Sequence, residues 1–213
     1  MPEDAQFWLN WWVNLGMALA TLAAVIVALF GSRIQAWLFK PGLALSVPDP
    51  RGESIQARIT SPSGAVSVVD ARYYHLRVTN RARWPAATGV QVFLIRLEEP
   101  GPDGQLQIKW ASEVPLRWMH QEVYPVTRTV GPNADADLCS VLKQNGAQLH
   151  PLIMPNNLAT YAQRQAAFDM VLSFQARSQE EASPIKRIPI SWDGKWQDGE
   201  AEMAQHLVVR ELN

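Results

Sequence analysis

Arginines and aromatic residues gather in one short segment, and they are the strongest candidates for ligand chemistry. In chain order they are Arg72, Tyr74, Arg77, Arg81, Arg83 and Trp84. Guanidinium groups beside aromatic rings can hold phosphates or nucleobases, so one interpretation is a patch that binds a phosphate-bearing or similar ligand. Two alternatives stay open. The patch could contact anionic lipid headgroups, or Arg72 and Arg77 could line the solvated face of a strand while the other arginines occupy its loop.

The single cysteine and the histidines show no catalytic or metal-binding pattern. A lone Cys139 excludes an intrachain disulfide, and its apolar neighbours predict a buried side chain rather than a nucleophile. The histidines are scattered without the spacing of metal ligands, at His75, His120, His150 and His206. The sequence also lacks a P-loop, a glycine-rich dinucleotide turn, an H-E-x-x-H motif and a G-x-S-x-G elbow. It therefore predicts no catalytic residue, no cofactor and no enzyme activity.

Alternating polar residues from Asn133 to Asp137 raise the question of a calcium loop. An EF-hand loop needs glycine at its sixth position and a bidentate glutamate at its last, where this chain has Leu138 and Gln144. Polar turn residues that lead into a strand explain the pattern better. The sequence therefore predicts no metal site.

The elements that must position these residues begin with an apolar segment from Phe7 to Gly31. A secretory signal would need a basic residue before the apolar run and a small-residue cleavage site after it, and neither is present. A bilayer core of about 30 Å needs about 20 helical residues, which this segment supplies. We therefore expect a retained single-pass transmembrane helix, within a first region of residues 1–40 that ends at Pro41-Gly42.

The charged flanks of the helix predict its orientation. Arg33 and Lys40 follow the apolar segment, and no basic residue precedes it. By the positive-inside rule, the N-terminus lies outside and the C-terminal region lies in the cytoplasm, at the inner (plasma) membrane of the cell.

Small residues recur along one side of the helix. Gly16, Ala20, Ala24 and Ala28 are four apart and form a stripe, and Asn14 lies near its outer end. Small residues at this spacing let two helices approach closely in lipid, and an asparagine there gains from a hydrogen bond to another helix. The pattern favours self-association; the alternative is that alanine is simply common in membrane helices.

Residues 41–213 are dominated by alternation with a period of two, which is typical of half-buried strands. The clearest runs are 74–79, 90–97, 168–175 and 188–192, with shorter candidates at 43–47, 55–60, 105–110, 126–130 and 207–210. Proline- and glycine-rich turns separate them. The pattern predicts a mainly β fold, with the helix followed by an antiparallel, immunoglobulin-like β-sandwich.

Several short motifs carry a resemblance to known proteins. They are Y-Y-H-L-R-V-T-N-R-A-R-W-P-A-A-T-G-V-Q-V from Tyr73, P-L-R-W from Pro115, A-D-L-C from Ala136 and G-K-W-Q-D-G-E-A-E-M from Gly194. Together they resemble uncharacterised bacterial proteins with a single-pass membrane anchor and a C-terminal β-sandwich. The resemblance implies this architecture and brings no activity with it.

The function that these observations favour is a non-enzymatic, membrane-anchored interaction module. Its sandwich would bind a cytoplasmic protein partner, and its helix would contact membrane lipid. The alternative is an oligomeric, signal-gated effector that perturbs the membrane when the sandwich binds a ligand. A net charge of −1 argues against general nucleic-acid binding.

Overall fold

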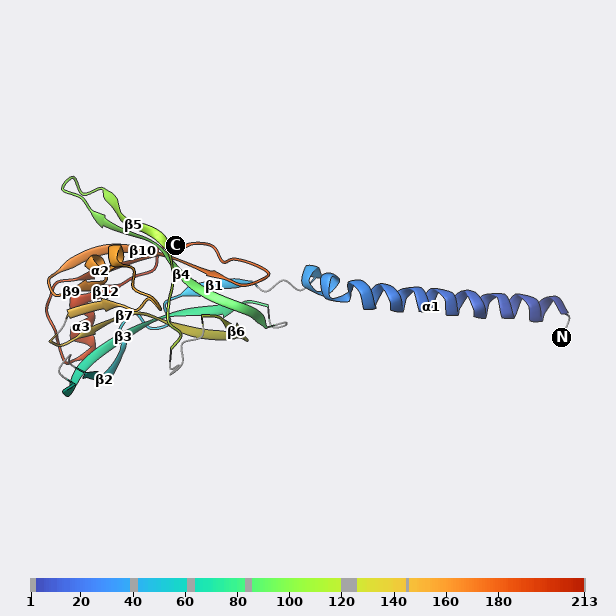
Figure 1. Cartoon of the computed structure of the whole chain (residues 1–213), viewed down its shortest axis with the longest axis horizontal. Coiled ribbons are helices and arrows are strands. Elements are labelled where there is room, and N and C mark those ends of the chain that lie inside the picture. Colours follow the sequence, from blue (N-terminus) through green and yellow to red (C-terminus); the bar gives the residue numbers. More distant parts are fainter. Residues whose placement is uncertain are drawn as a thin grey trace. The chain divides into compact units, whose positions relative to one another are not determined.

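The computed structural model describes residues 3–38, 42–60, 64–82, 86–119, 126–144 and 146–212. It divides the chain into two compact units, Met1–Lys40 and Pro41–Asn213 (Figure 1). Each unit is described by itself.

The first unit is one long helix, α1 (Glu3–Leu38). Its apolar stretch, Asn10–Gly31, has a mean hydropathy of 2.3, and none of it is buried among the described residues. At the N-terminal end, the rings of Trp8, Trp11 and Trp12 are exposed and meet edge to face. The helix is therefore long and apolar enough to cross a membrane, a property that a membrane anchor shares with a signal sequence.

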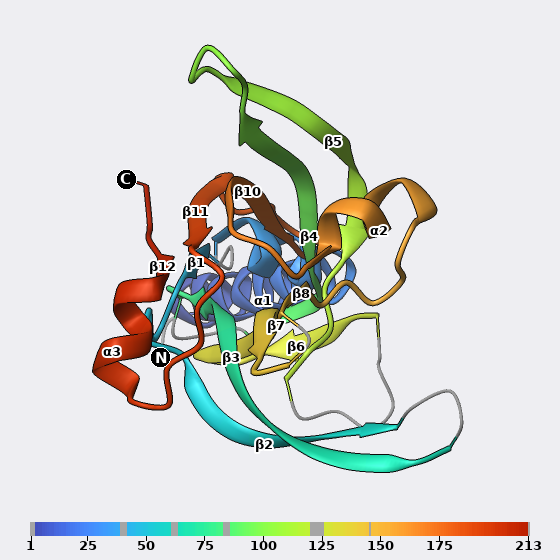
Figure 2. The same ribbon diagram turned by 90° about the vertical axis from the view of Figure 1, so that its left-hand side faces the viewer.

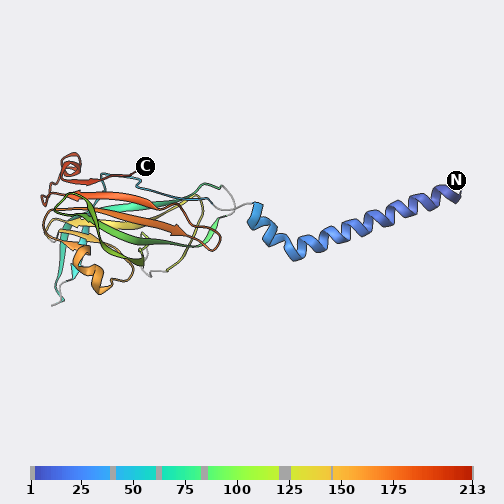
Figure 3. The same ribbon diagram turned by 90° about the horizontal axis from the view of Figure 1, so that it is seen from above.

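The second unit consists of two antiparallel sheets packed face to face, which confirms the predicted β-sandwich. The first sheet contains β1 (Leu43–Ser46), β2 (Glu53–Thr60), β3 (Val66–Asn80), β7 (Asn133–Leu142), β8 (Gly146–Leu149) and β9 (Gln163–Arg164). The second contains β4 (Ala87–Pro100), β5 (Leu106–Pro115), β6 (Arg128–Val130), β10 (Phe168–Arg177), β11 (Lys186–Trp192) and β12 (Leu207–Val209). Two short helices, α2 (Asn156–Ala162) and α3 (Glu200–His206), lie outside the strands (Figure 3).

The strand order follows the immunoglobulin pattern in its central part. The neighbours β1-β3-β7 take the places of strands A, B and E, and β5-β4-β10-β11 take those of C′, C, F and G. The first sheet departs from the pattern at its far end, because β8 follows β7 in the chain whereas the D strand of an immunoglobulin domain precedes E.

Inward-facing residues of the alternating runs form the core. Tyr74, Leu76 and Val78 of β3 are completely buried, and Leu172 of β10 and Ile188 of β11 lie opposite them in the same cluster. Each large aliphatic side chain buried in this way contributes about 1.5–3 kcal/mol to folding relative to an exposed one. This burial fixes which face of β3 looks inward.

Two hairpins extend beyond the packed part of the sandwich (Figure 2). The β2–β3 hairpin exposes Val66 and Val68, and the β4–β5 hairpin exposes Leu106 and Ile108. Strands β3 and β4 are therefore longer than the predicted runs 74–79 and 90–97.

Two local predictions were wrong. The polar residues from Asn133 onward already belong to β7, not to a turn before it. In the sequence, the Asp193-Gly194 pair between Trp192 and Trp196 predicts a tight hairpin, because Asp-Gly supplies the backbone angles of such a turn. Instead, Gly194 lies in a bend with φ +86° that leads to α3, and β12, the next strand to pair with β11, comes only after that helix.

Candidate binding site

The two arginines predicted to share a strand face lie on opposite faces of β3. Arg72 is two residues from Tyr74, so its side chain lies on the inner face of the strand, and it is only 1% exposed. Arg77 lies on the other face and is partly exposed. The interpretation of Arg72 as part of a solvated face is therefore wrong, because the odd spacing between the two arginines turns their side chains to different sides of the sheet.

The structure does not gather the remaining predicted residues into one patch. Tyr74 is buried in the core, where its hydroxyl has no hydrogen-bond partner among the described residues, and burial raises the pKa of this hydroxyl above its usual value. Arg81 is exposed just after β3, where its backbone N–H donates to the carbonyl of Gly42 over 2.8 Å. Arg83 and Trp84 lie outside the described residues.

A different set of polar side chains meets on the outer face of the first sheet, between β3 and β7. The pairs that stand directly opposite each other are Tyr73 with Ser140, His75 with Asp137, and Arg77 with Asp135. Cross-strand neighbours at such positions are close enough for their side chains to interact. We call this set the outer face.

A bulge in β7 creates this arrangement. The register shifts between Tyr74 and His75, where Leu138 is the extra residue of β7. Without it, strict alternation would turn Ser140 and Asp137 to opposite faces; with it, both face outward. Cys139 then faces inward and is buried, as predicted, and burial raises the pKa of its thiol to about 12.

The ion pair of Arg77 with Asp135 anchors one end of the outer face. Nε and Nη2 of Arg77 donate to the two carboxylate oxygens over 2.8 and 2.9 Å. This bidentate geometry is the stronger form of an arginine–carboxylate pair. The hydrogen bonds from Arg77 lower the pKa of Asp135 below its usual value.

His75 lies between carboxylates from the strands on either side. Its Nδ1 is 3.3 Å from an oxygen of Asp137 on β7, and its Nε2 is 3.6 Å from an oxygen of Glu53 on β2. Burial of the ring opposes its charged form, but the contact with Asp137 and the charges of Glu53 and Asp135 outweigh burial and raise the pKa of His75. Protonated His75 therefore links three strands electrostatically.

Tyr73 stacks on His150, the residue just after β8. The two rings are nearly parallel with centroids 5.2 Å apart, and His150 Nε2 lies 2.8 Å from the Ser140 hydroxyl. This Ser–His pair has the outline of a nucleophile and its base. However, Ser140 is completely buried, and burial lowers the pKa of His150 to about 4, which makes the ring a weak base. The pair therefore fastens β7 to the segment after β8.

The outer face borders a surface depression of about 580 Å³. Its lining includes Glu53, Arg72, Tyr73, His75, Arg77 and Met119. A second hollow of about 210 Å³ shares Glu53, Tyr73, His75 and Met119 with it. The sequence pointed to Arg72 and Arg77 as site residues, but it did not point to His75 and the carboxylates beside them. These side chains come together only because their strands pair in the folded sheet.

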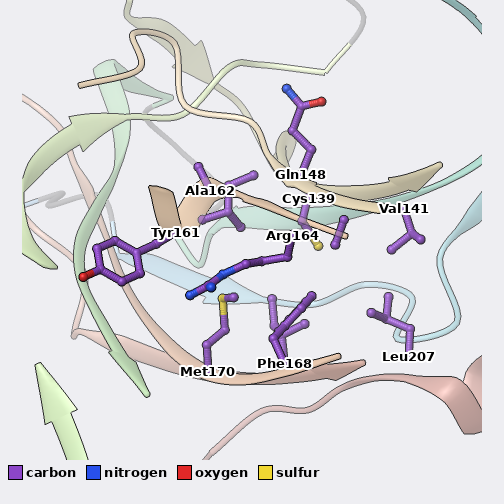
Figure 4. Close-up of a pocket in the computed structure, with 12 residues that line it drawn as sticks. Cys139, Val141, Gln148, Tyr161, Ala162, Arg164, Phe168, Met170 and Leu207 are labelled. Atoms are coloured by element: carbon purple, nitrogen blue, oxygen red, sulfur yellow. The ribbon is translucent and has the colours of Figure 1, made fainter. Parts of the chain in front are cut away.

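The space between the sheets holds a separate, apolar pocket (Figure 4). Cys139 and Met170 line it from the two sheets, and its volume is only about 10 Å³. That is about the space of one water molecule. At its side, the Arg164 guanidinium lies 5.4 Å from the ring centre of Tyr161 and pairs with Glu99. This pocket is a packing feature.

The predicted helix-packing residues all lie exposed on α1. They are Asn14, Gly16, Ala20, Ala24 and Ala28. A Cβ added at Gly16 would meet no atom within 4 Å among the described residues beyond its chain neighbours and the backbone of its own helix. The stripe therefore has no packing partner among the described residues.

Comparison with known proteins leaves the chain without an assigned relative. No protein-family model and no curated protein matches it. Within the described ranges, no three His, Cys, Asp or Glu side chains are placed to hold one metal ion. The resemblance to bacterial membrane-anchored proteins stays a prediction, while its coarse architecture, an apolar helix followed by two antiparallel sheets, is confirmed.

The opposite pKa shifts of the two histidines predict how stability depends on pH. The pKa of folded His150 is below the value of about 6.5 for an unfolded histidine, so its contribution is complete above pH 6.5 and is lost as the pH falls toward 4. The pKa of folded His75 is raised, so its contribution is complete below pH 6.5 and is lost as the pH rises through that higher value.

Urea unfolding of the full-length protein in detergent, followed by tryptophan fluorescence from pH 4 to 9, measures both effects. In the wild type, the free energy of unfolding is expected to fall at acidic pH as His150 is protonated. His150→Gln is expected to remove part of this decrease, up to roughly 3 kcal/mol. His75→Gln is expected to remove part of the decrease in the free energy of unfolding at alkaline pH. The same pH profile for both variants would contradict the assignment.

Proposed function

We propose that this chain is a non-enzymatic, membrane-anchored binding module whose sandwich recognises a partner through the depression on the outer face. The proposal is based on two features that occur together in this chain. One is an apolar helix with none of its 22-residue span buried, and the other is a separately packed sandwich with an open, polar and aromatic depression.

The helix serves as a retained anchor in this proposal. The segment before the apolar span contains acidic residues and no Lys or Arg, unlike the start of a secretory signal. Arg33 and Lys40 after the span favour a cytoplasmic sandwich and an N-terminus outside the inner membrane.

The depression is suited to recognition of a partner by its mixture of groups. Tyr73 and Met119 offer apolar surface, while Glu53, His75 and Arg77 offer charged groups within the same hollow. Binding sites commonly combine apolar walls with a few fixed polar groups, and the ion pairs described above hold these groups in place.

Cysteine footprinting tests both the site and the orientation. Ser54 lines the depression and Ser112 lies on β5 of the other sheet, and both are exposed. In cells, a membrane-permeant maleimide is expected to label Ser112→Cys rapidly and Ser54→Cys several-fold more slowly, because the partner covers the depression. The buried thiol of Cys139, the only native cysteine, keeps the background low.

The purified proteins provide the control, since both variants should then react at their intrinsic rates. A membrane-impermeant maleimide should label neither variant in intact cells. Equal protection of both positions, or none in cells, would count against the binding site; labelling of Ser112→Cys from outside would reverse the orientation.

A second candidate function is an oligomeric, signal-gated effector that perturbs the membrane. The exposed stripe of small residues on α1 favours it, because such a stripe allows close helix–helix contact in lipid. In this version, a ligand in the depression would rearrange copies of the helix.

Matched substitutions on two sides of α1 separate the candidates. Ala20 lies in the stripe, whereas Ala18, two residues earlier, projects from nearly the opposite side of the helix. If the helices associate, Ala20→Ile should lower the oligomeric state in sedimentation experiments and reduce membrane leakage on overexpression, while Ala18→Ile should not. A monomeric wild type, or equal effects of both substitutions, would exclude the effector.

A further inference from the structure

Among the described residues that line the depression, Arg72 is the one cation that is almost completely buried. Only 1% of the residue is exposed, although it lines the depression. Its Nη1 donates to the carbonyls of Arg51 and Gly52 over 3.3 and 3.2 Å, and its Nε has no hydrogen-bond partner in the described part of the chain. The guanidinium therefore holds the β1–β2 connection while part of its donor capacity stays unused.

The other cations around the depression each have an acidic partner. Arg77 pairs with Asp135, Arg51 lies 3.7 Å from Glu200, and His75 lies between two carboxylates. Among the described residues, none places a carboxylate within ion-pair distance of Arg72. A buried charge without a counter-charge is costly, and a bound anion would compensate for it.

We propose that the depression binds a ligand through one carboxylate or phosphate group that pairs with Arg72. The inference rests on the proposed function and adds the chemistry of recognition to it. A volume of about 580 Å³ matches a small-molecule site, and Tyr73 and Met119 form a wall for the remainder of the ligand.

The carboxylates of the lining restrict the ligand further. Four carboxylates of the described residues border the depression: Asp135 and Glu200, which pair with Arg77 and Arg51, and Asp49 and Glu53. Asp49 Oδ1 accepts a hydrogen bond from the backbone N–H of Arg51 over 2.9 Å. These charges repel a second anionic group. The site therefore selects a ligand with a single anionic end over a polyanion such as a nucleic-acid backbone.

Titration of the full-length protein in detergent with inorganic phosphate or benzoate, at constant ionic strength, tests the proposal. The midpoint of thermal unfolding is expected to rise saturably. Arg72→Lys should weaken the apparent affinity about tenfold, because lysine lacks the planar fork. Asp49→Asn keeps the turn acceptor, removes the repelling charge and should strengthen binding about threefold.

Arg58→Lys is the matched control, since Arg58 is exposed on β2 and does not line the depression. A non-saturable rise, or the same affinity in Arg72→Lys and Arg58→Lys, would overturn the proposal. If Arg72→Lys does not fold, Asp49→Asn is the variant that tests the proposal. Unchanged or weaker anion binding by Asp49→Asn would then overturn the proposed anion site.

Nanodiscs of phosphatidylcholine, with or without phosphatidic acid, distinguish two sources of the anion. Competition by phosphatidic acid would support a lipid headgroup, and undiminished phosphate binding would support a soluble ligand. If Ser54→Cys is protected in cells but no anion stabilises the purified protein, the proposal of a binding module would stand and the proposal of an anionic ligand would be wrong.

Discussion

β3 and β7 pair along nearly the whole length of β7, and Leu138 adds one residue to β7 within that ladder. Because side chains alternate along a strand, this register decides which polar groups share the outer face. It sets Arg77 against Asp135, His75 against Asp137 and Tyr73 against Ser140. The ion pairs and the ring stack follow from the register, and so does the shape of the adjoining depression.

Residues on the inner face of β3 pack in the core and hold the β1–β2 connection beside the same depression. Tyr74 fills the core, and Gly52 packs so closely on it, with φ +72°, that a Cβ would lie 2.7 Å from the ring. Arg72 holds the carbonyls of this connection from the same side of the strand. The polar outer face and the buried guanidinium therefore meet at the edge of the sheet, where the β1–β2 connection crosses it.

The sequence was sufficient for the architecture and insufficient for the site. Continuous apolar character predicted α1, and regular alternation predicted β3, β4, β10 and β11, because each pattern is local. The bulge at Leu138 interrupts the alternation of β7, so the strand was read partly as a turn, and the short β8 gave no signal. Arg72 and Arg77 were found by composition, but strand parity separates them, and their partners come from strands distant in sequence.

In the proposed binding mode, Arg72, buried beside the outer face, receives the anionic end of a ligand. The side-chain Nε–H signal of Arg72, observed by NMR in the full-length protein in detergent, tests it most directly. Because the Nε is buried, we expect slow solvent exchange and a saturable shift on addition of phosphate, with no change at exposed Arg58. An unchanged Arg72 signal, or equal shifts at both arginines, would contradict anion binding at Arg72.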